Sequence, residues 1–263
     1  MCIILTCEKN VRPTHDLVES CFLGNPDGAG IMWVEDGRVQ ISKGFMSAPQ
    51  LIQAIESTPI DSQLVIHMRI ATSGGINVGT CHPFPVCRDL DVLHAPDVEC
   101  DVAVAHNGVI KNMPTNDELG VSDTVTFVSE YMTELYKGKV TKNVKRRMRE
   151  IAPGNRFAVM TKDGSVYRVG DGWETVTEGI QASNSTWRWT YADLYDYEDE
   201  YYDGFDYPAY GPEYDDVFDL CCGKCKHIGS CMVYGPMCDE VYDAIEAWEE
   251  GELVSAEDLV AIA

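Results

Sequence analysis

Short apolar runs bounded by turn-forming residues recur along the chain, a pattern typical of β-strands. Two such runs flank Asp36-Gly37 and two flank Asp163-Gly164. Because Asp-Gly favours tight turns between antiparallel strands, each pair of runs predicts a hairpin. Strands are expected in the segments 3–6, 31–41, 63–70, 101–105 and 155–169.

Helix start signals stand between these strands. Ser47 is a candidate N-cap, Pro49 would occupy the first turn, and Gln50 would complete a capping box. Ser122 can cap a second helix, and a third segment is rich in Lys and Arg. Helices are expected from residue 47 to before residue 59, over 123–136 and over 141–151. Hairpins interleaved with helices predict an α+β fold in which helices cover antiparallel sheets.

The composition changes near residue 190. Residues 191–219 contain eleven Asp or Glu, eight Tyr and no Lys or Arg, so this stretch is expected to be a disordered linker. A cysteine-rich stretch and helix-like sequence follow it. The predicted organisation is one domain over residues 1–190, the acidic, Tyr-rich linker over 191–219, and a small Cys-rich helical module over 220–263.

Charge and apolar content narrow the classes of partner. The formal net charge is −23, from 43 acidic and 20 basic residues, which disfavours nucleic acid and anionic lipid as partners. No apolar run approaches the ~18–20 residues that a membrane helix needs. Glu8 and Lys9 interrupt the N-terminal apolar run, so no secretory signal is expected. An odd number of cysteines, eleven, favours reduced thiols, and we expect a cytoplasmic protein.

Four cysteines of the tail have a spacing that predicts a structural zinc site: Cys222, Cys225, Cys231 and Cys238. A CxxC pair can supply two of the four thiolates that structural zinc takes. The alternative is a set of reduced, partly buried thiols, because six residues separate Cys231 from Cys238 and this second pair is therefore not a CxxC. A redox pair at Cys222 and Cys225 ranks lower, since no thioredoxin-like strand and helix surround it.

Cys2 directly follows the initiator Met1. Removal of Met1 would leave a thiol and a free α-amine on one residue, and an α-amine has an unperturbed pKa of roughly 7.7–8.0. Such a residue can serve as nucleophile and base together. With Met1 attached, the Cys2 nitrogen is an amide and cannot act as a base.

Four short motifs follow Cys2 along the chain, and each has an ordinary structural explanation as a turn, an ion-pair partner or a helix start. They are Asn25-Pro26-Asp27-Gly28-Ala29-Gly30, His67-Met68-Arg69-Ile70-Ala71-Thr72, His106-Asn107-Gly108-Val109-Ile110 and Ser122-Asp123-Thr124. In this order behind Cys2, they resemble the class II glutamine amidotransferase family of N-terminal nucleophile (Ntn) hydrolases. That family has an N-terminal Cys, an H-x-R-x-A-T segment, an H-N-G segment and an S-D-T segment. The resemblance covers residues 1–190.

The resemblance implies a four-layer αββα sandwich of two antiparallel sheets, with no cofactor for catalysis. It implies that Cys2 attacks the glutamine carboxamide, while Asn107 and Gly108 stabilise the oxyanion. It also implies a binding site for the substrate head group. There Arg69 would bind the α-carboxylate, Asp123 would bind the α-ammonium, and Thr72 would line the pocket. The two histidines of the matched segments are expected to be core residues.

The implied function is a glutaminase that releases ammonia through an N-terminal Cys thioester and passes it to a separate partner enzyme. The sequence departs from the family at Ile3, Ile70 and Ser73-Gly74, where Gly, an aromatic residue and His-Gly are common. One alternative is therefore a hydrolase of another γ-glutamyl amide. A second is a non-catalytic interaction protein on an amidotransferase-like fold.

Overall fold

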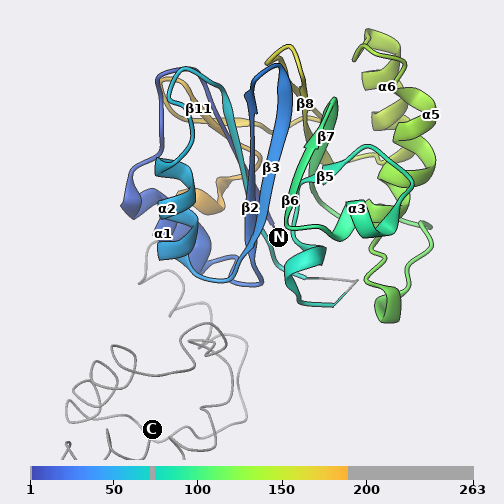
Figure 1. The fold of residues 1–263 in the computed structure, drawn as a ribbon, viewed down its shortest axis with the longest axis horizontal. Helices are drawn as coiled ribbons and strands as arrows, with labels where there is room; N and C mark the ends of the chain where they lie inside the picture. Colours follow the sequence, from blue (N-terminus) through green and yellow to red (C-terminus); the bar gives the residue numbers. More distant parts are fainter. Residues whose placement is uncertain (1, 72–74, 189–263) are drawn as a thin grey trace, which may run out of the picture. The chain divides into compact units, whose positions relative to one another are not determined.

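The computed structural model describes residues 2–71 and 75–188, which form two facing antiparallel β-sheets with helices on the outside (Figure 1). The expected linker, the Cys-rich module with its four candidate zinc ligands, and Thr72 lie outside the described residues. The α+β prediction is confirmed for the described part of the chain. The domain boundary near residue 190 stays a prediction.

The larger sheet has seven strands in the order β10-β11-β1-β4-β2-β3-β6, and each neighbouring pair is antiparallel. Its strands are β1 (Ile3–Cys7), β2 (Ala29–Glu35), β3 (Arg38–Phe45), β4 (Leu64–Met68), β6 (Asp97–Cys100), β10 (Glu174–Thr177) and β11 (Ile180–Ala182). The N-terminal strand β1 lies inside this sheet, between β11 and β4. Cys2, which directly precedes β1, is thus attached to a central strand of the larger sheet.

The smaller sheet has the order β5-β7-β8-β9 and is also antiparallel. Its strands are β5 (Phe84–Pro85), β7 (Val102–Asn107), β8 (Arg156–Thr161) and β9 (Val166–Val169). β7 is buried along its whole length, as the run of small apolar residues predicts.

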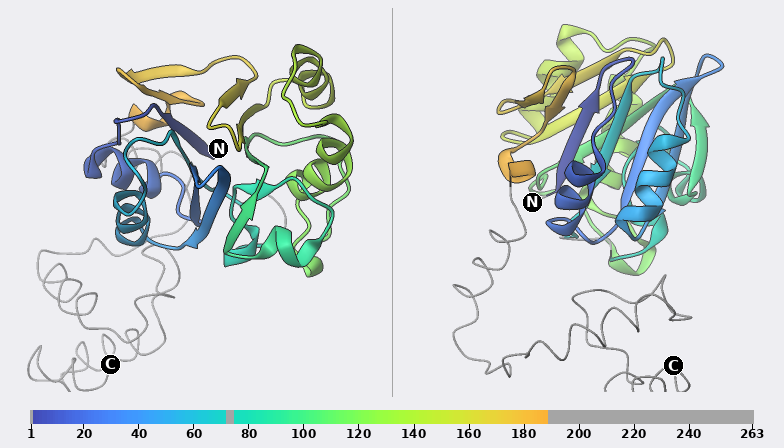
Figure 2. Two further views of the ribbon diagram at one scale, coloured as in Figure 1. Left: turned by 45° about the horizontal axis from the view of Figure 1, so that its top comes forward. Right: turned by 90° about the vertical axis from the view of Figure 1, so that its left-hand side faces the viewer.

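Helices cover the outer face of each sheet (Figure 2). The larger sheet carries α1 (His15–Leu23) and α2 (Ala48–Glu56). The smaller sheet carries α3 (Leu90–His94), α4 (Asp123–Thr126), the π-helical segment η3 (Phe127–Met132), α5 (Thr133–Leu135) and α6 (Lys142–Ile151). Three short 3-10 turns are η1 (Val78–Thr80), η2 (Asp117–Leu119) and η4 (Ser185–Arg188).

Three separate apolar clusters follow from the period-two alternation of strand side chains. One joins the larger sheet to α1 and α2, and another joins the smaller sheet to α3–α6. The third lies between the sheets, where Ile4 of β1 packs near Ala103 and Ala105 of β7. The small side chains of β7 let the two sheets approach closely. The order of layers is helix, sheet, sheet, helix.

Both predicted hairpins form, as β2–β3 and β8–β9. Asp36 and Gly37 have φ values of 51° and 72°, the left-handed conformation that a tight hairpin turn of this type requires. The helix expected over 123–136 begins at Asp123, with the Ser122 hydroxyl accepting from the Val125 N–H at 3.2 Å. It is not a uniform α-helix, because its middle is wound as the π-helical segment η3.

The capping box predicted at Ser47 is wrong. Ser47 occupies the N-cap position of α2 but its hydroxyl makes no capping hydrogen bond. Gln50 Oε1 instead accepts from the backbone N–H of Met46 at 3.1 Å, one residue upstream. Neither hydrogen bond of the capping box is therefore present, although the helix ends before Pro59 as expected.

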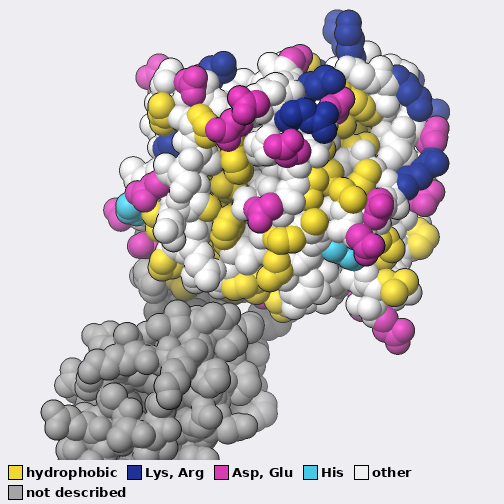
Figure 3. Space-filling model, in the orientation of Figure 1, with side chains coloured by type: hydrophobic (Ala, Val, Ile, Leu, Met, Phe, Trp, Pro, Cys, Tyr) yellow, Lys and Arg dark blue, Asp and Glu magenta, His cyan; other side chains and the backbone are white. Residues whose placement is uncertain are grey.

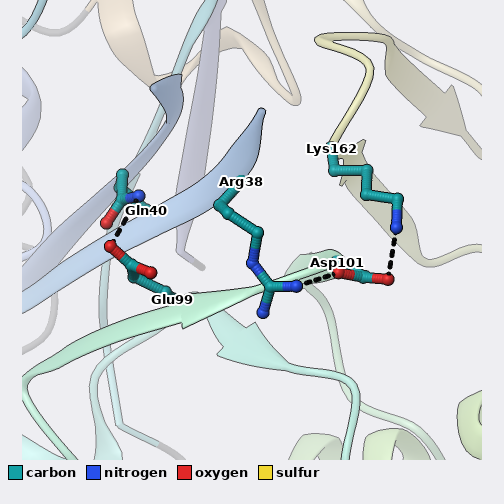
Figure 4. Close-up of polar contacts among 5 residues, drawn as sticks. All are labelled: Arg38, Gln40, Glu99, Asp101 and Lys162. Carbon is teal, nitrogen blue, oxygen red and sulfur yellow. Dashed lines mark hydrogen bonds and ion pairs between the residues drawn. The ribbon is translucent and has the colours of Figure 1, made fainter. Parts of the chain in front are cut away.

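Polar contacts join the two sheets at one end (Figure 4). Asp101, just before β7, pairs with Arg38 of β3, and its other oxygen lies 2.7 Å from Lys162 Nζ in the β8–β9 turn. Beside them, Gln40 Nε2 donates to Glu99 Oε1 at 3.2 Å. We call Arg38, Asp101 and Lys162 the ion-pair bridge. It lies at the start of β7, at the opposite end of that strand from Asn107.

The described surface carries both signs of charge. Lys and Arg side chains gather over the end of the molecule where α6 lies, among scattered acidic ones (Figure 3). Residues 1–188 hold 23 acidic and 18 basic side chains, so most of the net charge of −23 comes from residues after 188. Within the described residues, no helix is both long and apolar enough to cross a membrane.

Candidate active site

Strand pairing places Cys2 beside Arg69. β1 and β4 are antiparallel with Ile3 opposite Met68, so the next pair outward is Cys2 and Arg69. Ile3 and Met68 face α1 and α2, and they belong to the apolar cluster there. Because strand side chains alternate, Cys2 and Arg69 face the opposite side, toward the smaller sheet. Ile3, which departs from the glycine common in the resembling family, is therefore a core residue on the other face.

Asn107 comes to the same region from the smaller sheet. It is the last residue of β7, and the alternate residues Ala103 and Ala105 pack between the sheets. Asn107 therefore points into the space between the sheets as well, and it is fully buried. Three residues far apart in sequence, Cys2, Arg69 and Asn107, thus lie at the same end of the two sheets, where β1 begins and where β4 and β7 end.

The Cys2 thiol is enclosed by backbone. Its Sγ lies 3.3 Å from both the nitrogen and the carbonyl oxygen of Ile70. Burial raises the pKa of the Cys2 thiol above its usual value of 9.0, against the Ile70 N–H and the positive charge of Arg69, which favour the thiolate. The thiol is accordingly protonated near neutral pH, and nucleophilic attack requires a base.

Arg69 is buried, with 4% of its surface exposed, and is anchored to the following loop. Its Nη1 donates to the Gly75 carbonyl at 2.7 Å and to Thr80 Oγ1 at 3.2 Å. Thr80 in turn accepts from the Asn77 N–H at 3.2 Å. The guanidinium is therefore held by the chain that follows it rather than extended into solvent.

The glycine-rich motif supports the end of β4. The Arg69 N–H donates to the Gly28 carbonyl at 2.9 Å, and the Asp27 N–H donates to the Arg69 carbonyl at 3.0 Å. Asp27 Oδ2 accepts from the Ala71 N–H at 2.7 Å. Gly28 has a φ of 104°, and a Cβ there would lie 2.5 Å from Cys81 Sγ, so a larger residue does not fit. The motif thus fixes the backbone on both sides of Ile70.

The Asn107-Gly108 turn is equally constrained. Gly108 has a φ of 138°, and an added Cβ would lie 2.1 Å from Asn155 Oδ1. The Asn107 Nδ2 lies 2.8 Å from Ser183 Oγ, while Oδ1 is buried and has no hydrogen-bond partner among the described residues. A buried amide oxygen without a partner is uncommon in native proteins. One end of the Asn107 amide is therefore without a protein partner among the described residues.

Asp123 is joined to the loop that follows Asn107-Gly108. Its Oδ2 accepts from the Ile110 N–H at 2.6 Å, and its Oδ1 accepts from the Thr124 N–H at 2.7 Å and from Thr124 Oγ1 at 3.3 Å. The carboxylate is 7% exposed and is stabilised by neutral donors. The structure therefore brings Asp123 beside the loop that follows the Asn107-Gly108 turn, and its hydrogen bonds order that loop.

The two histidines of the matched motifs are buried structural residues, as expected. His106 bonds Thr124 Oγ1 and Asn155 Oδ1, each at 2.7 Å. His67 Nε2 lies 2.9 Å from the His106 carbonyl oxygen and so links the two sheets. Burial lowers the pKa of His67 to about 3 and also lowers that of His106, so both are neutral near pH 7. Neither bonds the Cys2 sulfur.

Ser183 and Asn184 are site residues that the motifs did not indicate. They directly follow β11, and Asn184 Nδ2 donates to the Cys2 carbonyl at 2.9 Å. Two polar residues after a short apolar run are too common a pattern to identify a site. Their proximity to Cys2 depends on the β1–β11 pairing, which the sequence alone did not predict.

Metal-ligating side chains do not cluster in the described part of the chain, where no group of three or more could hold an ion. The cysteines of the predicted zinc site, Cys222, Cys225, Cys231 and Cys238, lie outside that part. The zinc site stays a prediction.

Comparisons with known proteins found similarity to a curated protein and to a solved structure. No family model matches the sequence. Over 144 residues it is 27% identical to glutamine–fructose-6-phosphate aminotransferase (isomerizing) from Aquifex aeolicus (strain VF5), covering 51% of this chain and 22% of that one. A solved structure of glutamine phosphoribosylpyrophosphate (PRPP) amidotransferase from B. subtilis, complexed with ADP and GMP, aligns with 18% identity and a TM-score of 0.40. That alignment covers 70% of this chain and 42% of the other. The chain therefore spans less than a quarter of its curated relative.

Proposed function

From the membership of this domain in the class II glutamine amidotransferase family, we propose that the protein hydrolyses the side-chain amide of glutamine and releases ammonia. The observation that carries the proposal is the pairing of Cys2 with Arg69 at the end of β1 and β4, with the Asn107 amide reaching the same space from β7. A nucleophile, a cation for a carboxylate and a neutral amide donor are the groups that this reaction needs.

The nucleophile is Cys2, activated by its own α-amine once Met1 is removed. Because burial raises the thiol pKa, the resting group is a thiol rather than a thiolate, and the amine takes its proton during attack. The sulfur bonds to the amide carbon, the C–N bond breaks, and the leaving nitrogen takes that proton to depart as ammonia. Water then hydrolyses the γ-glutamyl thioester to glutamate and restores the thiol.

Other residues bind the substrate and stabilise the transition state in this proposal. Arg69 binds the α-carboxylate, for which a planar guanidinium is well suited. Asp123 is assigned to the α-ammonium, and Thr72 to the wall of the head-group site. The Asn107 amide and the Gly108 N–H stabilise the oxyanion of the tetrahedral intermediate.

We assign the released ammonia to a separate acceptor enzyme. The described residues comprise a single sandwich. The predicted acidic linker and the tail module are the candidate docking segments, and a solvated linker with no binding role is the simpler alternative for residues 191–219.

A second substrate class is supported by one contact. Ile70 replaces the aromatic residue common in the resembling family, and its backbone touches the Cys2 sulfur. A change at a position that adjoins the nucleophile favours a changed leaving group or acyl group. Hydrolysis of another γ-glutamyl amide is therefore the second candidate function.

The test is the intact mass of the protein after incubation with a glutamine-analogue electrophile. We expect loss of Met1 and one adduct on the wild type, and no adduct on Cys2→Ala. Ammonia release from glutamine, measured beside amine release from γ-glutamyl dipeptides, separates the two substrate classes. A native protein that retains Met1 and takes no label would overturn both and favour a non-catalytic interaction protein.

A further inference from the structure

Ser183 occupies an unusual position in the larger sheet. It follows β11, is fully buried, and pairs with Ile4 in continuation of the β1–β11 register. Its N–H donates to the Ile4 carbonyl at 2.9 Å, while the Ile4 N–H donates to the Ser183 hydroxyl at 2.9 Å rather than to a backbone oxygen. The hydroxyl is thus part of the ladder that holds β1, two residues after Cys2.

The same hydroxyl contacts the smaller sheet. Ser183 Oγ lies 2.8 Å from the Asn107 side-chain nitrogen, so one oxygen connects the strand that carries the nucleophile with the proposed oxyanion donor. The neighbouring Asn184 bonds the Cys2 carbonyl. Ser183 is therefore the only described residue whose side chain hydrogen-bonds both β1 and Asn107.

The donors and acceptors available on Ser183 and Asn107 determine which way the Asn107 amide is oriented. A serine hydroxyl has one donor and two acceptor sites. With Asn107 Nδ2 turned to Ser183, the oxygen accepts two N–H bonds. Its own O–H then has no acceptor among the described residues, and neither does Asn107 Oδ1 have a donor. Two buried polar groups would be unsatisfied, which native structures avoid.

Rotating the amide by 180° exchanges its oxygen and nitrogen without moving the other heavy atoms. Ser183 then donates its O–H to Asn107 Oδ1 and still accepts from the Ile4 N–H. Asn107 Nδ2 then occupies the position that Oδ1 held before the rotation, where the described residues offer no hydrogen-bond partner. An NH₂ group in that place is a donor available to a ligand.

We propose that Ser183 is a positioning residue that holds the Asn107 amide with its NH₂ turned toward the oxyanion of the tetrahedral intermediate. The inference rests on the proposed function. Without the Ser183 hydroxyl, the amide rotates, and it presents its oxygen to a developing negative charge in part of the molecules. The loss falls on the transition state, because the substrate carbonyl in the ground state carries little charge.

The experiment is a double-mutant cycle of Ser183→Ala and Asn107→Ala with kcat and KM measured for ammonia release. In the wild-type background, Ser183→Ala should lower kcat by about 10-fold, the size of one hydrogen bond, with KM within about twofold. In the Asn107→Ala background it should change kcat by less than about twofold, because the side chain on which Ser183 acts is gone. Ser183→Thr keeps the hydroxyl and should restore most of the activity.

Ser62→Ala is the matched control. Ser62 is also buried and its hydroxyl accepts from a strand N–H, that of Val34, at 3.0 Å, but it does not contact Asn107. It should lower the melting temperature as Ser183→Ala does and leave kcat unchanged. If Ser183→Ala does not fold, the isosteric Ser183→Cys, a weak donor, takes its place in the same cycle.

An equal loss of kcat from Ser183→Ala in both backgrounds, or a loss seen mainly in KM, would show that Ser183 only supports β1, and would overturn the inference. Failure of the proposed function has a different signature: the wild type itself releases neither ammonia from glutamine nor amine from γ-glutamyl dipeptides.

Discussion

The Cys2 sulfur lies 3.3 Å from the backbone nitrogen of Ile70, the residue that directly follows Arg69. The nucleophile is therefore set against the backbone of the segment whose side chain is proposed to bind the substrate. The arrangement arises from sheet pairing, since Ile3 stands opposite Met68. Because of this position, the protonation state of the Cys2 thiol depends on burial as well as on the neighbouring charge of Arg69.

The pH dependence should report the α-amine rather than the thiol. Burial raises the pKa of the Cys2 thiol, so the base that must lose its proton is the amine, with an ordinary pKa of roughly 7.7–8.0. We expect kcat/KM to fall as the pH drops below that value, because the protonated amine cannot accept the thiol proton. A profile of kcat/KM against pH, beside the rate of Cys2 alkylation, measures this. Fast alkylation at pH 6 would contradict the prediction.

Arg69→Ala should mainly weaken substrate binding. A charge-assisted hydrogen bond to a carboxylate contributes roughly 1.5–3 kcal/mol, so KM should rise about 10- to 100-fold with a smaller change in kcat. Arg69→Lys keeps the charge but loses the planar fork, and it should give an intermediate KM. Because Arg69 also anchors the loop through Thr80, melting temperatures of both variants are the necessary control. A loss confined to kcat would refute the assigned role.

Asn107→Ala should lower turnover. Loss of one oxyanion donor typically reduces kcat about 10²- to 10³-fold while KM changes little. Asn107→Asp keeps the shape but places an acceptor at the oxyanion, so it should be at least as inactive as the alanine variant. Steady-state kinetics on glutamine measure both. An unchanged kcat in Asn107→Ala would remove this residue from the mechanism.

Gly108→Ala should destabilise the fold. The new Cβ would lie 2.1 Å from Asn155 Oδ1 at a φ of 138°, which combines a steric clash with backbone strain. Strain of this kind costs on the order of 1–3 kcal/mol, and the clash adds to it. Gly164→Ala is the matched control, since its φ is also positive at 84° but nothing lies within 4 Å of the added Cβ. Urea unfolding of both variants gives the difference, and an equal loss would exclude the clash.

Lys43 should make stability depend on pH. Its Nζ is buried against the Gly79 and Leu93 carbonyls and over the Phe84 ring, and desolvation lowers its pKa from 10.5 to about 7. Between pH 7 and 10.5 the unfolded chain therefore binds more protons than the folded one, so this group makes stability rise with pH in that window. Lys43→Met removes this contribution of Lys43 to the pH dependence of stability.

Urea unfolding of the wild type and Lys43→Met at pH 7 and pH 10 isolates that term. Buried cysteines such as Cys7, whose pKa is raised to about 12, act in the opposite direction but equally in both proteins. The wild type should gain stability relative to the variant as the pH rises. A constant difference between the two would contradict the shift.

The sequence predicted those elements whose signals are local. Asp36-Gly37 specifies its own turn, and Ser122 caps the helix that follows it. Strand β6 was missed because it is a short edge strand whose exposed positions are Asp97 and Glu99, so its pattern looks polar. The π-helical segment was missed because it depends on packing in the interior and has no local start signal.

Only those residues of the candidate site that stand in local sequence motifs could be predicted. Cys2, Arg69 and Asn107 stand in recognisable motifs, whereas Ser183 and Asn184 act on the backbone of β1 and on a side chain of β7. Contacts of that kind exist only after strands distant in sequence have paired. The histidines could be assigned to the core from the sequence, but the cross-sheet bond of His67 to the His106 carbonyl could not.

Strand β7 joins two features at its ends, because Asp101 of the ion-pair bridge directly precedes it and Asn107 closes it. The ion-pair bridge lies where β7 starts. Because strand side chains alternate between faces, an even or odd number of residues in β7 then decides which face its last side chain occupies. One residue inserted into β7 would turn the Asn107 amide toward the helices and move His106 into its place. The length of β7 can therefore change only in steps of two residues if the Asn107 side chain is to keep its place between the sheets.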